Sequence, residues 1–160
     1  MATNAEAALE ILTKSVGNEE GVGEWFTVKQ DQINLFADAT YDHQFIHIDP
    51  EKSAQMSPYK TTVAHGFLTL SLLPHLGSSI PRSDPEAYKG MAMGINYGLD
   101  KVRFPNPVRV DSKVRARRSM MSVELKNPTT IQTKQLVTIE IEGEKKPACV
   151  AESLTRLVYS

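Results

Sequence analysis

The stretch Thr61-Thr-Val-Ala-His65-Gly66-Phe-Leu-Thr-Leu-Ser-Leu-Leu73 decides the fold of this chain. Between Phe67 and Leu73 it carries no charged residue, and its apolar side chains would cover nearly every side of a helix. A helix that is hydrophobic all round is buried, whereas a surface helix keeps one polar face. We therefore predict a central buried helix, capped by Thr61 or Thr62 and kinked or ended at Pro74.

The residues after this helix alternate between apolar and polar, as antiparallel strands do. The alternation changes phase between Leu99 and Val102, which predicts a β-bulge. Glu142-Gly143-Glu144 marks a turn between two long strands, and a further short strand is expected near Trp25 and Thr27, before the helix. A sheet with one apolar face and a helix that is apolar all round can cover each other if the sheet curls around the helix. The pattern therefore predicts an α+β fold, with a long antiparallel sheet wrapped around one central buried helix.

Length, charge and cysteine content narrow the class of protein. The 160 residues are expected to form a single domain, residues 1–160, with a substantial core. A net charge of −1 gives no overall field that would favour nucleic acid or a membrane as partner. The lone Cys149 excludes an internal disulfide and is typical of a reducing compartment. Without a signal-like or membrane-spanning apolar stretch, the chain is expected to be cytoplasmic.

Basic residues gather between Lys101 and Arg118, where Asp111 is the only acidic residue. Such a segment is either a solvated strand face or a surface that meets an anionic ligand. Both interpretations stay open from the sequence.

A carboxylate and an imidazole lie close together just before the central helix. Asp42 and His47 are five positions apart in a segment that ends at Pro50, which disfavours helix at Asp49, so a loop is expected there. A carboxylate and a histidine can share acid and base work. Gly66, at the helix start, can offer its backbone amide to a developing negative oxygen. A purely structural explanation is also open, in which Asp42 and His47 are surface residues and Gly66 allows close packing.

The run Thr40-Tyr41-Asp42, followed by Ile46-His47 and then Val63-Ala64-His65-Gly66, resembles the hydratase motif of the MaoC-like dehydratases, the (R)-specific enoyl-CoA hydratase family. The segments 96–108 and 147–153 are similar to the NodN-like branch of that family. The resemblance covers residues 24–158 and implies the hot-dog fold.

The resemblance also implies a function. The reaction would be the reversible hydration of trans-2-enoyl-CoA to (R)-3-hydroxyacyl-CoA, with Asp42 and His47 as the catalytic pair and the Gly66 amide as oxyanion hole. No metal and no cofactor are expected, since coenzyme A enters only as part of the thioester substrate. The partner is expected to be a second copy of the chain, with the acyl chain near the interface of the homodimer. The residues expected to contact substrate or the second subunit are Tyr41, His65, Asn96 and Arg103.

The chain departs from the family at one position inside the motif. The family usually has glycine where this chain has Tyr41, so tyrosine is strained there if φ is positive; otherwise its ring fills part of the pocket. Two rival functions remain beside the hydratase. One is a hot-dog thioesterase, which often needs a carboxylate on or near the central helix, and residues 67–73 offer none. The other is a non-catalytic acyl-thioester-binding module.

Overall fold

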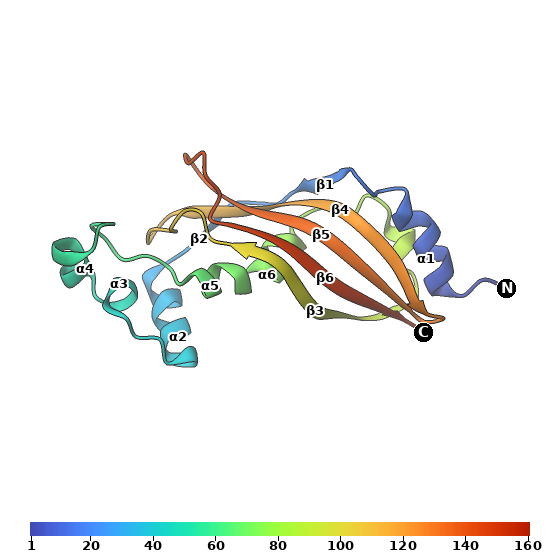
Figure 1. The fold of residues 1–160 in the computed structure, drawn as a ribbon, viewed down its shortest axis with the longest axis horizontal. Helices are drawn as coiled ribbons and strands as arrows, with labels where there is room; N and C mark the ends of the chain where they lie inside the picture. The colour runs from blue at the N-terminus through green and yellow to red at the C-terminus, as the bar shows by residue number, and fades with distance from the viewer.

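The computed structural model describes all residues, 1–160. Its main feature is one antiparallel sheet with the strand order β1-β4-β5-β6-β3, in which the short β2 also pairs with β4 (Figure 1). The strands are β1 (Glu19–Val22), β2 (Phe26–Thr27), β3 (Met91–Arg103), β4 (Lys113–Asn127), β5 (Thr130–Ile141) and β6 (Cys149–Tyr159).

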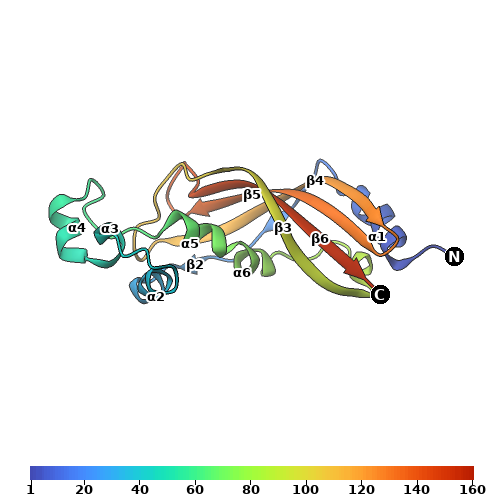
Figure 2. The ribbon, with the colours of Figure 1, turned by 60° about the horizontal axis from the view of Figure 1, so that its bottom comes forward.

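The helical segment that the sheet covers consists of α5 (Gly66–Ser71) and α6 (Leu73–Ser78), which lie along one face of the curved sheet (Figure 2). The predicted α+β hot-dog arrangement is therefore confirmed. The predicted interruption at Pro74 is confirmed, because α5 ends at Ser71 and the chain starts a second helix at Leu73, just before the proline. Proline has no N–H to continue the helical hydrogen bonds, so α6 starts afresh with Pro74 in its first turn.

The helix also begins later than predicted, at Gly66 rather than after Thr61 or Thr62. The preceding residues are extended, because the Ala64 amide donates to the Val108 carbonyl at 2.8 Å and Val63 bridges to Arg109. These long-range hydrogen bonds pair backbone groups of the segment without a helix, so Gly66 becomes the first helical residue.

Two hydrophobic clusters form the core. The larger one has 16 buried residues and joins α5 and α6 to the covered face of β4, β5 and β6. The smaller one packs α1 (Asn4–Thr13) and the 3₁₀ turn η1 (Pro85–Tyr88) on the far end of the sheet. Burial of the helix is incomplete, since Phe67 is 68% exposed. The prediction of a helix buried on every side therefore fails at this residue in the single chain.

Three further helices, α2 (Gln30–Thr40), α3 (Phe45–Ile48) and α4 (Pro50–Met56), gather at the end of the sheet opposite α1 and both termini (Figure 1). Asp49 caps α4 by accepting a hydrogen bond from the Lys52 amide at 2.9 Å, and Pro50 occupies the first turn. The segment predicted as a loop between Asp42 and Asp49 is not all loop, because α3 forms one helical turn within it.

The irregularities of β3 follow the sequence pattern only in part. The predicted bulge is present as a register shift between Asp100 and Arg103, where Lys101 has a φ of 49°. Two further shifts, between Met91 and Met93 and between Asn96 and Gly98, were not predicted. No helix of the chain is both long and apolar enough to cross a membrane.

Candidate active site

Asp42 stands at the point where α2 ends. Ile33 and Ala37 anchor α2 in the core, and the helix terminates at Tyr41, whose backbone is left-handed with φ 62° and ψ 18°. The Tyr41 side chain is 87% exposed. Of the two outcomes left open for this position, the strained backbone is therefore observed, and the ring does not fill a pocket of its own chain.

His47 is the buried member of the site. It lies on α3 and is 7% exposed, and its Nδ1 is 2.6 Å from the carbonyl oxygen of Val63. A carbonyl oxygen only accepts, so Nδ1 must carry the proton and donate it. In the neutral imidazole, Nε2 is then left with a free lone pair, which is the form that a general base requires.

The surroundings also favour the neutral form of His47. Burial is the largest influence and lowers the pKa of His47 below its ordinary value of 6.5. The hydrogen bond to Val63 acts in the opposite direction, the neighbouring His65 lowers the pKa, and Asp42 raises it. The net effect lowers the pKa of His47 and so favours the neutral imidazole at neutral pH.

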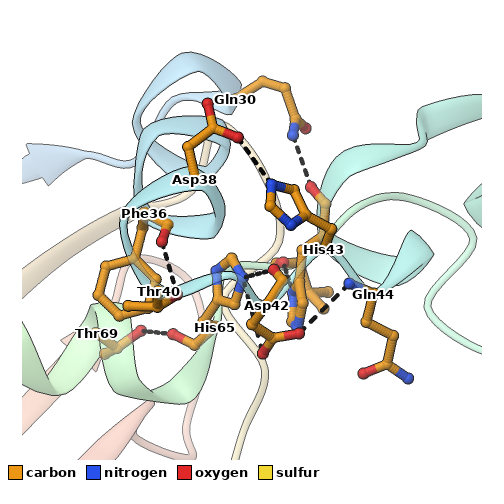
Figure 3. A network of polar contacts seen from close by, with 11 residues as sticks. Gln30, Phe36, Asp38, Thr40, Asp42, His43, Gln44, His65 and Thr69 are labelled. Atoms are coloured by element: carbon orange, nitrogen blue, oxygen red, sulfur yellow. Dashed lines mark hydrogen bonds and ion pairs between the residues drawn. The ribbon is translucent and has the colours of Figure 1, made fainter.

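His65 links the other two residues. It is 2% exposed, and its ring stacks on that of His47 with 3.8 Å between centroids and an interplanar angle of 23°. Its Nε2 donates to the backbone oxygen of Asp42 at 2.9 Å and lies 4.0 Å from Asp42 Oδ2, which Figure 3 shows below the end of α2. His65 therefore holds the chain at Asp42 and fixes the plane of the His47 ring.

These three residues are the one group of His, Cys, Asp and Glu side chains that lie close enough to share an ion. One donor atom from each of Asp42, His47 and His65 lies within 4.8 Å of the others. One nitrogen of each imidazole already donates to a backbone carbonyl. The same closeness suits acid–base work, in which a carboxylate and an imidazole act on one small molecule.

Gly66 occupies the first position of α5, directly after His65. Its amide donates to no backbone or side-chain acceptor, as expected for the first turn of a helix. A Cβ at this position would lie 3.1 Å from the Phe104 ring. Glycine thus permits close packing against Phe104 and also leaves an N–H free at the residue that follows His65, so the two explanations of Gly66 are compatible.

Asn96 and Arg103 lie outside this group. Asn96 is on β3 opposite Thr155 and lines a cavity between the sheet and the helices α5 and α6. Arg103 ends β3, and its guanidinium donates to the neighbouring Val102 carbonyl at 2.7 Å. No hydrogen bond or ion pair joins either residue to Asp42, His47 or His65, so their predicted contact with substrate stays a prediction.

The structure adds two residues that the sequence did not reveal. The carbonyl of Val63 selects the tautomer of His47. This contact comes from a backbone atom, so the pattern of side chains in the sequence could not predict it. Phe36, an aromatic residue of α2, packs on His65 with 4.9 Å between ring centroids.

The basic segment separates into two faces of β4. Arg115 and Arg117 point away from the helices and both bind Glu140 at 2.8 Å. Arg118 lies on the opposite, covered face and lines the cavity beneath α6. The segment is therefore neither a uniform solvated face nor a single ligand surface.

Comparison with known proteins assigns the family. The family model for the MaoC like domain matches residues 13–142. The chain is 50% identical over 147 residues to 3-hydroxyacyl-thioester dehydratase Z of Mycobacterium tuberculosis, covering 92% of this chain and 93% of the relative. It is 45% identical over 155 residues to Nodulation protein N of Rhizobium leguminosarum bv. viciae, covering 96% and 93%.

A solved structure supports the fold. The (R)-hydratase from A. caviae involved in PHA biosynthesis matches with a TM-score of 0.64 at 22% identity, over 84% of this chain and 94% of that chain. The fold, the ordered Asp42, His47 and His65-Gly66 motif and the matches over nearly the whole length agree with one another, and the chain belongs to the MaoC-like dehydratase family.

Proposed function

We propose that this protein is a hydro-lyase that adds water reversibly to a trans-2-enoyl thioester, with coenzyme A as the carrier. The observation that carries the proposal is the tautomer of His47: Nδ1 donates to Val63, so Nε2 is free to accept a proton beside the Asp42 carboxylate. The relatives named as a thioester dehydratase and an (R)-hydratase support the same class of reaction. The (R) configuration of the product is proposed from the family resemblance.

The geometry suits one water held between the two side chains. No direct hydrogen bond joins the Asp42 and His47 side chains, and their ligand atoms lie within 4.8 Å of each other, a gap that one water with bonds of about 2.8 Å on each side can bridge. His47 Nε2 takes a proton from this water as its oxygen bonds to C3 of the substrate. The Asp42–His47 pair delivers a proton to C2 on the same face, so that one water is added across the double bond.

The electrons of the broken double bond move onto the thioester oxygen, which becomes an enolate before C2 is protonated. The free amide of Gly66 is the donor proposed for that oxygen. Removing one such donor typically costs about 10²–10³ in kcat, so this contact is as valuable as the base itself. Glycine at this position also allows close packing against Phe104, because a Cβ there would lie 3.1 Å from the ring.

A second copy of the chain is the partner that the surface of β3 favours. β3 is the edge strand of the sheet, and a row of its large apolar side chains is 43–53% exposed: Met93, Ile95, Tyr97 and Leu99. An unpaired apolar edge is a liability that proteins normally cover. We propose that two β3 strands meet in a homodimer, whose interface also covers the exposed Phe67 beside the active site.

The proposed reaction is tested by giving purified protein crotonyl-CoA and following three signals: loss of the conjugated double bond, the 3-hydroxyacyl product and free thiol. Hydration with no free thiol supports the hydro-lyase. Free coenzyme A without a 3-hydroxyacyl product would replace it with the thioesterase. Binding of the thioester without any turnover would indicate the non-catalytic module instead.

A further inference from the structure

A long cavity runs between the sheet and the helices α5 and α6, starting near the active site. Its first part, of about 540 Å³, begins at Leu70, one helical turn after Gly66. A second part, of about 610 Å³, continues toward the far end of α6. The two parts lie next to each other, because their walls have six residues in common: Pro74, Gly77, Ile80, Arg118, Gln135 and Thr155. An acyl chain whose carbonyl lies at Gly66 has this space before it.

The shared wall contains a guanidinium group, which is unusual in a space meant for hydrocarbon. Arg118 lies on the covered face of β4 between the buried Ala116 and Met120, and its side chain is only 20% exposed. The guanidinium reaches directly beneath α6, because a Cβ on Gly77 would lie 3.2 Å from Arg118 Nη1. Gly77 therefore leaves room for the charged group in the cavity wall.

The terminal nitrogens of Arg118 have no partner in the protein. The nearest anion is Glu20, whose Oε2 lies 3.3 Å from Arg118 Nε, although Nε itself is buried without a hydrogen bond of acceptable geometry. The same Glu20 oxygen already accepts a hydrogen bond from Gln135 at 2.6 Å. Neither Nη of Arg118 donates a hydrogen bond to any residue, so the N–H groups of both are free to bind a ligand in the cavity.

The charge around the inner end of the cavity is positive on balance. Arg82 also lines the second part, where its guanidinium lies 4.1 Å from the centre of the Tyr88 ring. Against the two guanidinium groups of Arg82 and Arg118 stands the single carboxylate of Glu20. A hydrocarbon chain at this depth would displace water from Arg118 without accepting hydrogen bonds from its N–H groups. Leaving these donors without acceptors costs free energy of binding.

We propose that the preferred substrate carries a carboxylate at the far end of its acyl chain and that Arg118 binds this group. The proposal rests on the hydratase function and names its substrate class. A guanidinium binds a carboxylate through two parallel hydrogen bonds, and the free Nη groups of Arg118 supply both donors. From Gly66 to Gly77 the two helices α5 and α6 advance eleven residues, which spans at most about 16 Å and limits the length of the chain between thioester and carboxylate.

The test compares pairs of trans-2-enoyl-CoA substrates of equal chain length, one ending in a methyl group and one in a carboxylate, across a series of lengths. The parent protein should show a higher kcat/KM for the carboxylate member once the chain is long enough to reach Arg118. Arg118→Met should remove about tenfold to a hundredfold of that preference, as expected for a charge-assisted pair of hydrogen bonds. Turnover of crotonyl-CoA, which is too short to reach, should be retained.

Two further variants keep the result unambiguous. Arg115→Met is the matched control, because it makes the same change on the outer face of β4 and should leave the preference unaltered. Glu20→Gln removes the competing carboxylate, so it should increase the preference for the anionic chain even if Arg118→Met fails to fold.

The proposal would be overturned if the parent protein hydrates the methyl-ended substrate at least as well at every length. It would also be overturned if the folded Arg118→Met variant or the Glu20→Gln variant leaves the preference unchanged. In either case, continued hydration of crotonyl-CoA would show that the proposed reaction survives and only the substrate class is wrong. Loss of all turnover in the parent protein would instead refute the hydratase function.

Discussion

The role of the Gly66 amide can be tested by a substitution that removes its hydrogen and leaves the hydrogen bonds of the fold intact. Gly66→Pro does this, because proline has no N–H and is tolerated at the first position of a helix. The residue before a proline must be extended, and His65 already has φ −58° and ψ 138°. No hydrogen bond of the fold is lost, since the Gly66 amide donates to nothing.

The expected size of the effect follows from what this amide is proposed to do. An oxyanion donor is worth about 10²–10³ in kcat, or about 2.7–4 kcal/mol. The added ring also introduces a Cβ 3.1 Å from Phe104, which has 41% of its surface exposed and can shift by a few tenths of an ångström. Gly66→Ala introduces the same Cβ but keeps the N–H, so it is the matched control.

The assay is the hydration rate of crotonyl-CoA at saturating substrate, with the denaturant midpoint measured in parallel. Both variants should unfold within about 1 kcal/mol of the parent, because alanine and proline are both acceptable at this helix position. The Pro variant should be about a hundredfold to a thousandfold slower than the Ala variant. Equal rates for the two would show that the amide is not used, and Gly66 would then serve packing against Phe104 alone.

Three other predictions concern the surroundings of the site. Because burial lowers the pKa of His47, its neutral form persists as pH falls, so the acid limb of the kcat/KM profile for hydration should lie below pH 6.5. An acid limb at or above pH 6.5 would contradict the assignment of His47 as the base. Tyr41→Gly removes the strain of a non-glycine residue with positive φ, at some cost in chain entropy, so it should raise the free energy of unfolding by up to about 1 kcal/mol, measured with denaturant, while the hydration rate stays level or rises. A clear loss of stability would show that the tyrosine ring is needed. Replacing Met93 and Ile95 together by lysine should convert the proposed dimer to a monomer by light scattering, and a parent protein that is already monomeric at micromolar concentration would refute the dimer.

Much of the fold could be predicted because the pattern of hydrophobic residues along the sequence determines which side chains are buried in the core. The uncharged stretch 67–73 and the alternation after residue 94 were sufficient to place a helix against a curved sheet. The start of the helix could not be predicted from Thr61 and Thr62, because the backbone bond from Ala64 to Val108 decides it, and that partner lies far away in sequence. The turn α3 was missed for a related reason: its four residues are too few for a helical period to be visible.

The candidate site likewise has features that the sequence predicts and features that it does not. Asp42, His47 and Gly66 were visible as an ordered motif, and the structure brings them together around His65. The carbonyl of Val63 could not be found, because every residue has one.

Arg118 is different, because its position could have been inferred. Val114, Ala116, Arg118 and Met120 alternate onto one face of a strand, which separates Arg118 from Arg115 and Arg117. Grouping the three arginines by charge alone hid that signal.

The central claim is that Asp42 and His47 act as one unit on one water, and a double-mutant cycle on the hydration rate tests it most directly. Asp42→Asn and His47→Gln keep approximate shape and hydrogen-bonding capacity, so folding and thioester binding should survive. Each single variant should lose about 10²–10⁴ in kcat, and the double variant should lose little more, because residues that act together are strongly non-additive. Parent-like rates in both single variants, or losses that multiply in the double variant, would contradict this assignment.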